Sequence, residues 1–162
     1  MRGFTVEPFD TARWHPRTRG VYQYWRHLQH PHARLPTRAA FDAFAVPEAL
    51  GWIRMHDIER DPFGLRCRLF GTRVAAAVGV DITGQNLLER PLSDSQRPLD
   101  EARLRTTAID GLATWARTPP ILRHGDIWSE VESLMLPLAD DGERPDILLG
   151  VSVYYRFDGS AV

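Results

Sequence analysis

The chain has 162 residues and a mass of 18.5 kDa, which suffices for one domain with its own hydrophobic core. A formal net charge of −1 argues against a nucleic-acid or membrane partner that is held by charge. All 20 basic residues are arginine, which excludes Schiff-base and P-loop chemistry because both use a lysine amine. The single cysteine, Cys67, excludes an intramolecular disulfide and a metal site built from several thiolates.

The sequence also bears on location. The longest charge-free run is only Ile147–Tyr155, far short of the roughly 20 residues that span a bilayer. The first residues lack the apolar segment of a signal peptide, so we expect a cytoplasmic protein without a membrane partner.

The first half of the chain combines one helix with a pair of strands. Residues 1–16 are expected to form an irregular arm, because Pro8 and Pro16 interrupt any periodic pattern. Apolar side chains at helical spacing then predict an amphipathic helix over residues 17–29. These side chains are Val21, Tyr22, Tyr24, Trp25 and Leu28. After residue 51 the period changes to two, which predicts strands over 52–59 and 65–70, joined as a hairpin.

The second of these strands alternates between apolar and charged residues. One face is expected to carry Leu65, Cys67 and Leu69, and the other Arg66, Arg68 and Phe70. In the first strand, Asp57 and Glu59 also share a face. We expect these two carboxylates to meet the arginines across the hairpin as solvated ion pairs, rather than to act as an acid–base pair.

Helical segments separate this hairpin from the last strands. Short helices are predicted over residues 72–78 and 87–90, and a longer one from Leu99 to Arg117. Strands follow over 121–124, 128–138 and 146–157, with a turn at Asp140-Asp141-Gly142. This order predicts one α+β domain over residues 17–158 with a tail at 159–162. Its core would be a five-stranded antiparallel sheet with a helical crossover on one face.

Several short motifs resemble the core of PAS sensor domains. They are Arg68–Val74, Val78-Gly79 and Asp81–Leu87. One bacterial, stand-alone PAS subfamily is matched more closely, by Tyr24-Trp25, Leu35–Arg38, Asp57–Glu59, Arg66–Thr72, Thr83-Gly84 and Leu136–Leu138. The resemblance implies a sensory or regulatory fold whose crossover leaves a concavity over one sheet face, where PAS domains hold their ligands. Independently of it, Gly79 suits a left-handed helix cap and Gly84 suits a turn with positive φ.

The pattern gives two sets of candidate binding residues. The candidate pocket is lined by Leu65, Cys67, Leu69, Val74, Val78, Ile109, Leu112, Val151 and Val153. The candidate interface is the apolar stripe of the first helix, formed by Val21, Tyr22, Tyr24, Trp25 and Leu28. Such a helix commonly covers the outer face of its own sheet or a partner's. A homodimer is therefore expected, with a small molecule or a signalling protein as further candidate partners.

Reactive chemistry finds little support in the sequence. Cys67 lies between apolar neighbours, which favours a buried, inert thiol, and it lacks the motif of flavin-reactive PAS cysteines. His27, His30 and His32 are more typical of a solvated helix end than of a metal site. Haem-binding PAS domains usually draw a histidine ligand from the crossover, and residues 71–117 contain none. No metal is expected, flavin and haem are both disfavoured, and the identity of any cofactor is open.

Three functions remain open. The favoured one is a non-catalytic sensory module that binds a small ligand or a protein and signals through altered packing or dimerisation. A second is an enzyme on a small α+β cone fold, for which His56 and Asp57 are the only adjacent histidine–carboxylate pair. Adjacent residues of a strand face opposite ways, which counts against that enzyme. A third is a dimerisation scaffold without a ligand.

Overall fold

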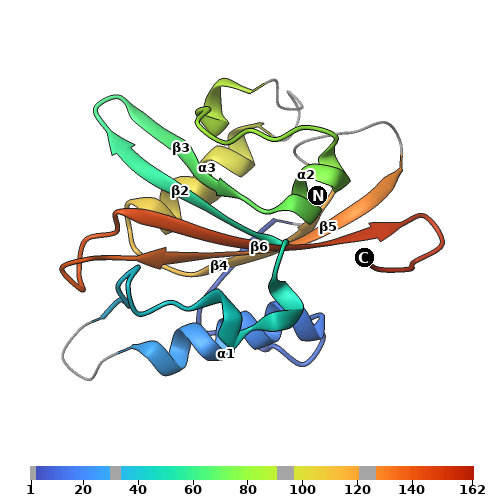
Figure 1. Ribbon diagram of the computed structural model, residues 1–162, viewed down its shortest axis with the longest axis horizontal. Coiled ribbons are helices and arrows are strands. Elements are labelled where there is room, and N and C mark those ends of the chain that lie inside the picture. Colours follow the sequence, from blue (N-terminus) through green and yellow to red (C-terminus); the bar gives the residue numbers. More distant parts are fainter. Residues whose placement is uncertain (1–2, 30–33, 91–96, 121–126) are drawn as a thin grey trace.

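An antiparallel sheet divides the protein into two sides, as the computed structural model shows (Figure 1). The structure describes residues 3–29, 34–90, 97–120 and 127–162. In these residues the sheet has six strands in the order β1-β4-β5-β6-β2-β3. The strands are β1 (Thr5–Val6), β2 (Ile53–Arg60), β3 (Phe63–Phe70), β4 (Thr114–Thr118), β5 (Trp128–Leu138) and β6 (Ile147–Arg156). The predicted α+β class with an antiparallel sheet is confirmed.

The helices lie on both faces of the sheet (Figure 1). They are α1 (Pro16–Leu28), α2 (Thr72–Val78) and α3 (Arg97–Ala108), with short 3-10 turns η1 (Ala43–Ala45), η2 (Pro47–Ala49) and η3 (Leu87–Glu89). Helix α1 covers one face, and α2 and α3 cover the other, which places the predicted crossover where the sequence implied it. Gly79 ends α2 with a φ of 76° and Gly84 has a φ of 82°, so both glycine predictions are confirmed. No helix in the described parts of the chain is long and apolar enough to cross a membrane.

Residues at both ends of the described chain contribute to the sheet. Strand β1 lies within the arm 1–16 and pairs with β4, with Thr5 opposite Trp115. Neither β1 nor β4 is among the five predicted strands. Near the other end, Ala161 bridges to Tyr155 of β6. Main-chain hydrogen bonds also join Val162 to Tyr154 in both directions.

The long helix predicted from Leu99 to Arg117 is wrong. Helix α3 ends at Ala108, Gly111 adopts a φ of 69°, and β4 begins at Thr114. The alanines at 113 and 116 fit a helical period, but residues 114–118 pair with β5 along their whole length, and this tertiary pairing overrides the local helix preference. The strand predicted over 121–124 lies outside the described residues.

The two faces of β3 differ from the prediction beyond Cys67. Met55 of β2 pairs with Leu69, whereas His56 pairs with Cys67, so Arg68 is an extra residue on β3. Such a bulge shifts the alternation by one residue. Leu69 is consequently 42% exposed and Phe70 is buried, the reverse of the expectation.

Helix α1 packs on its own sheet. Val21, Tyr22 and Trp25 are buried within the single chain, and the Trp25 indole donates a hydrogen bond to the Pro137 carbonyl at 3.0 Å. Tyr24 and Leu28 are only partly exposed. The three buried side chains of the candidate interface are therefore occupied within the chain and are not available to a partner in this fold.

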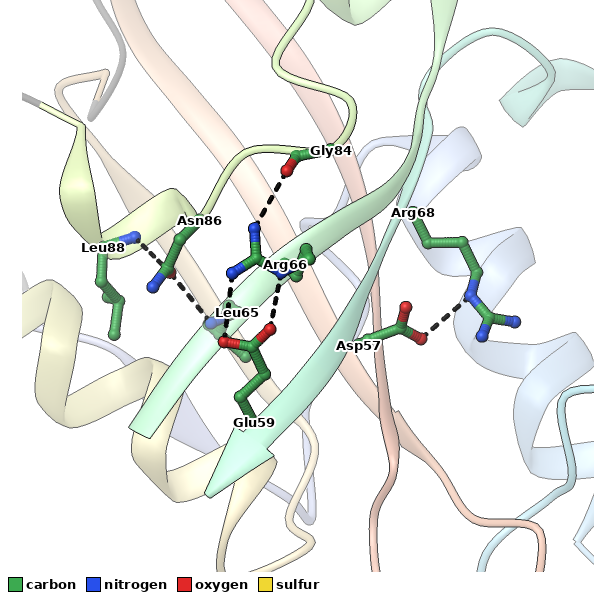
Figure 2. Close-up of polar contacts among 8 residues, drawn as sticks. All are labelled: Asp57, Glu59, Leu65, Arg66, Arg68, Gly84, Asn86 and Leu88. Atoms are coloured by element: carbon green, nitrogen blue, oxygen red, sulfur yellow. Dashed lines mark hydrogen bonds and ion pairs between the residues drawn. The ribbon is translucent and has the colours of Figure 1, made fainter. Parts of the chain in front are cut away.

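The β2–β3 hairpin carries the ion pairs that the sequence predicts (Figure 2). Arg66 lies 2.6 Å from Glu59 and Arg68 lies 2.9 Å from Asp57, in each case to a carboxylate oxygen. Both pairs run diagonally across the hairpin and remain exposed to solvent. They contribute little to stability and are not a buried carboxylate pair.

The outer edge of β3 is covered by the segment between α2 and η3. The Asn86 side-chain oxygen accepts hydrogen bonds from the backbone N–H groups of Leu65 and Leu88, both at 3.1 Å (Figure 2). Cys67 adds two backbone hydrogen bonds, to Gln85 and from Gly84, both at 2.8 Å. This segment therefore closes an edge that would otherwise expose unpaired backbone groups.

Replacing Asn86 with alanine is expected to lower the free energy of unfolding by about 1–3 kcal/mol, because two backbone donors lose their acceptor. Urea denaturation with a constant m-value measures this change. The matched control is Gln85→Ala, whose exposed side chain accepts a hydrogen bond from Arg90 at 2.9 Å and whose loss should have little effect. Equal stabilities of the two variants would contradict this role of Asn86.

Candidate functional site

A cavity of about 50 Å³ lies between the sheet and the α2–α3 side. Its wall combines apolar side chains with arginine, histidine, hydroxyl and phenol groups. The lining residues are Arg54, His56, Phe70, Val74, Leu87, Arg103, Thr118, Val131, Ser133, Met135, Ser152 and Tyr154. These residues come from β2, β3, α2, η3, α3, β4, β5 and β6, so the whole crossover and most of the sheet shape this space.

Arg54 crosses the neighbouring strand to reach the cavity. Its side chain lies over Gly150 of β6, where an added Cβ would come within 2.9 Å of Nε. Its guanidinium donates hydrogen bonds to the Ser152 hydroxyl and, at 3.1 Å, to the Ser133 hydroxyl. Burial lowers the pKa of Arg54, and no carboxylate among the described residues forms an ion pair with it.

Arg103 enters the cavity from α3 and is only 3% exposed. Its guanidinium donates to the Thr114 hydroxyl at 3.2 Å, to the Thr114 carbonyl at 3.3 Å and to the Ser133 carbonyl. Burial lowers its pKa to about 9, and the nearby positive charge of Arg54 acts in the same direction. Ser133 therefore holds two cations on neutral oxygen atoms, one on its side chain and one on its backbone.

Asp100 is the carboxylate whose charge acts on Arg103. It lies one helical turn before Arg103, and its charge partly opposes the lowering of that residue's pKa. Burial raises the pKa of Asp100 itself to about 6. One oxygen atom of its side chain has no hydrogen-bond partner among the described residues. Asp100 thus moderates the positive charge without pairing directly with either arginine.

His56 is fully buried beside Arg54 and lines the same cavity. Burial, followed by the charge of Arg54, lowers its pKa to about 3. The imidazole is therefore neutral near pH 7, with one donor and one acceptor nitrogen. Neither nitrogen has a hydrogen-bond partner among the described residues. Buried polar atoms are nearly always paired. The unpaired donor and acceptor nitrogens of His56 therefore leave hydrogen-bonding groups in the cavity wall that a ligand could use.

The structure places the predicted pocket residues in different locations. Val74 lines the cavity; Leu65, Cys67 and Val78 are buried but do not line it. Leu69 is exposed because of the β3 bulge, Ile109 is exposed beyond the end of α3, and Leu112 is partly exposed.

Val151 and Val153 lie on the opposite face of β6. Their neighbours Ser152 and Tyr154 line the cavity, and successive residues of a strand point to opposite faces. Glu132 of β5 pairs with Val153, and its carboxylate accepts a hydrogen bond from the backbone N–H of His15, the N-cap of α1. The face chosen for this strand from its apolar pattern is therefore the α1 face.

The sequence reasoning missed Arg54, Arg103 and the two serines. Arg54 alternates with apolar neighbours and so resembles a residue of a solvated face. One signal was present in β6: Gly150 and Ser152 interrupt an otherwise bulky apolar strand. Small residues in a central strand indicate that another side chain approaches closely.

The remaining candidates for chemistry are separated from one another. Cys67 is buried, and burial raises its pKa to about 11, so the thiol is protonated at neutral pH as expected of an inert cysteine. His56 faces the cavity, whereas Asp57 pairs with Arg68 outside. Within the described ranges no group of three or more histidine, cysteine, aspartate or glutamate residues is placed to hold a metal, and His30 and His32 lie outside these ranges.

The depressed pKa of His56 predicts a specific pH dependence of stability. Its ordinary value is 6.5, so its contribution to the free energy of unfolding is fully present above pH 6.5. It is lost as pH falls toward 3, by about 1.4 kcal/mol per pH unit. Between pH 7 and 5, the wild type should lose about 2 kcal/mol more than His56→Gln in urea denaturation.

Asp100 has the opposite sign in this experiment. Its raised pKa adds stability as pH falls below 6, so the wild-type curve alone does not isolate the histidine. The difference between wild type and His56→Gln does, because both retain Asp100. His27→Gln, at the exposed end of α1, is the control and should follow the wild type. Parallel curves for all three proteins would contradict a buried neutral His56.

Comparison with known proteins identifies the family. A family model described as a PAS domain matches residues 13–153, which include α1, the hairpin, the crossover and most of β6. No curated protein and no solved structure matches the chain. The matched range contains the cavity and all of its lining residues except Tyr154. The chain belongs to the PAS domain family.

Proposed function

We propose that this PAS domain is a sensory module that binds a small ligand in the cavity next to His56 and transmits a change in packing. PAS domains are in general sensory or regulatory rather than catalytic. The observation that carries the proposal is the unpartnered, fully buried imidazole of His56, which faces a cavity together with two arginines. A ligand that satisfies these groups stabilises one arrangement of the cavity wall over others.

Ser152 connects the cavity with the α1 side of the sheet. Its hydroxyl accepts a hydrogen bond from Arg54 in the cavity, and its carbonyl accepts one from Arg17 of α1 at 3.1 Å. Arg17 also donates to the carbonyls of Glu48 and Val162 and lies 4.4 Å from the centre of the Trp52 ring. A shift of Arg54 on ligand binding would therefore alter the contacts that attach α1 to the sheet.

The output of this module is a protein contact. The expected homodimer stays a prediction, and its interface would use surfaces other than the buried residues of α1. A cytoplasmic location likewise stays a prediction from the sequence.

The alternative of an enzyme loses its proposed His56–Asp57 pair, because the two side chains lie on opposite faces of β2.

Filling the cavity is expected to abolish ligand binding. In Val74→Phe the larger side chain would occupy the space that the ligand needs. Native mass spectrometry of freshly purified protein, with thermal shifts over a panel of small metabolites, should detect binding to the wild type and not to this variant. Leu69→Phe is the matched control, since Leu69 is exposed on the adjoining strand and should leave binding intact.

Val131→Phe provides a second filled cavity if Val74→Phe does not fold. Binding that survives in both filled variants would place the ligand elsewhere. A wild type that carries no added mass and responds to no compound would instead support the scaffold function.

A further inference from the structure

The chemistry of the cavity wall indicates which class of ligand it accepts. Two guanidinium groups meet there and are held by neutral partners, with Ser133 bonded to both. Burial lowers the pKa of each guanidinium group, and the charge of Arg54 further lowers the pKa of Arg103. Like charges in a poorly solvated space repel each other. An anion between the two guanidinium groups would be attracted by both and would offset their repulsion.

The arginines also retain hydrogen-bonding capacity. Arg54 Nε and Arg103 Nη1 make no hydrogen bond to any described residue. The neutral imidazole of His56 adds one further donor. Planar guanidinium groups match the two oxygens of a carboxylate, and such charge-assisted hydrogen bonds are stronger than neutral ones.

The other ionisable groups near the cavity do not supply this anion. Asp100 makes no ion pair with either arginine. Burial raises the pKa values of both Tyr154 and Cys67, so both groups are neutral near pH 7. The positive charge on the cavity wall is therefore compensated only in part by the described chain.

Size and apolar lining narrow the class further. With a volume of about 50 Å³, the cavity is small and suits a ligand of a few non-hydrogen atoms. The rest of the wall is apolar, from Phe70, Val74, Leu87, Val131 and Met135. An alkyl group fits this surface better than a further oxygen atom does.

We propose that the cavity binds a short-chain monocarboxylate, whose carboxylate lies between Arg54, Arg103 and His56 and whose alkyl group contacts the apolar wall. The inference rests on the proposed ligand-binding function and specifies its ligand. Acetate and propionate have the appropriate size. The anion satisfies the histidine and neutralises the repulsion between the arginines in a single binding event.

Calorimetric titration of the full chain at pH 7 tests this proposal, with sodium acetate and sodium propionate as probes. Acetamide matches acetate in shape but lacks the charge, and sodium chloride controls for ionic strength. Saturable binding of the carboxylates, with no binding of acetamide or chloride, is the expected result. Arg103→Gln and Arg54→Gln should each weaken the carboxylate affinity about tenfold or more, because each removes a charge-assisted hydrogen bond.

Arg68→Gln is the matched control variant, because it removes an arginine from the outer face of the hairpin and should bind as the wild type does. Two arginine variants are used so that a folding failure of one leaves the other, and thermal unfolding establishes that each is folded. Carboxylate binding that both variants retain overturns the proposal, as does equal binding of acetamide or the absence of carboxylate binding.

The failure of this inference can be distinguished from failure of the proposed function. If a neutral compound binds to the wild type and not to Val74→Phe, while carboxylates do not bind, the cavity is a ligand site of another class. If Val74→Phe and Val131→Phe leave all binding unchanged, both proposals fail.

Discussion

The structure depends on one strand that is buried on both faces. Every residue of β6 from Ile147 to Tyr155 is buried, and the strand pairs with β5 on one side and β2 on the other. Each of its side chains must therefore fit beneath either α1 or the α2–α3 side. This constraint explains why small residues matter here. Gly150 leaves room for Arg54 to cross β6, and Ser152 supplies that arginine with an acceptor.

The same constraint creates a core that is polar at its centre. Burying two guanidinium groups and an imidazole without a carboxylate partner costs free energy, since desolvation favours their neutral forms. Hydroxyl and carbonyl oxygens of Ser133, Ser152 and Thr114 offset part of this cost. A protein of this size could fill the space more cheaply with apolar side chains. Polar groups that are costly for stability and converge on one cavity are typical of binding sites.

Much of the fold could be predicted from the sequence, and the reasons for the errors are physical. Alternation located β2, β3, β5 and β6, and glycine positions located the end of α2. Ala113 and Ala116 fit a helical period, yet residues 114–118 form β4, because pairing with β5 outweighs the local preference. The bulge at Arg68 inverted the end of β3, since one extra residue is invisible to a period of two. For β6 both faces are largely apolar, and only the small residues Gly150 and Ser152 distinguish the face that lies toward the cavity.

The central position of β6 also affects the order in which the strands can pair during folding. It follows all the other strands in the chain, yet Val151 pairs with Ile53 of β2 and Leu134 of β5 at once. During synthesis, the β2–β3 hairpin and the β4–β5 pair can form early, but no strand joins them until β6 leaves the ribosome. The pairing between β2 and β6 closes a loop of roughly a hundred residues, the kind of distant contact that slows folding. Until then the backbone N–H and C=O groups on one edge of β2 are unpaired, so this stage of folding is the one most exposed to association with other chains.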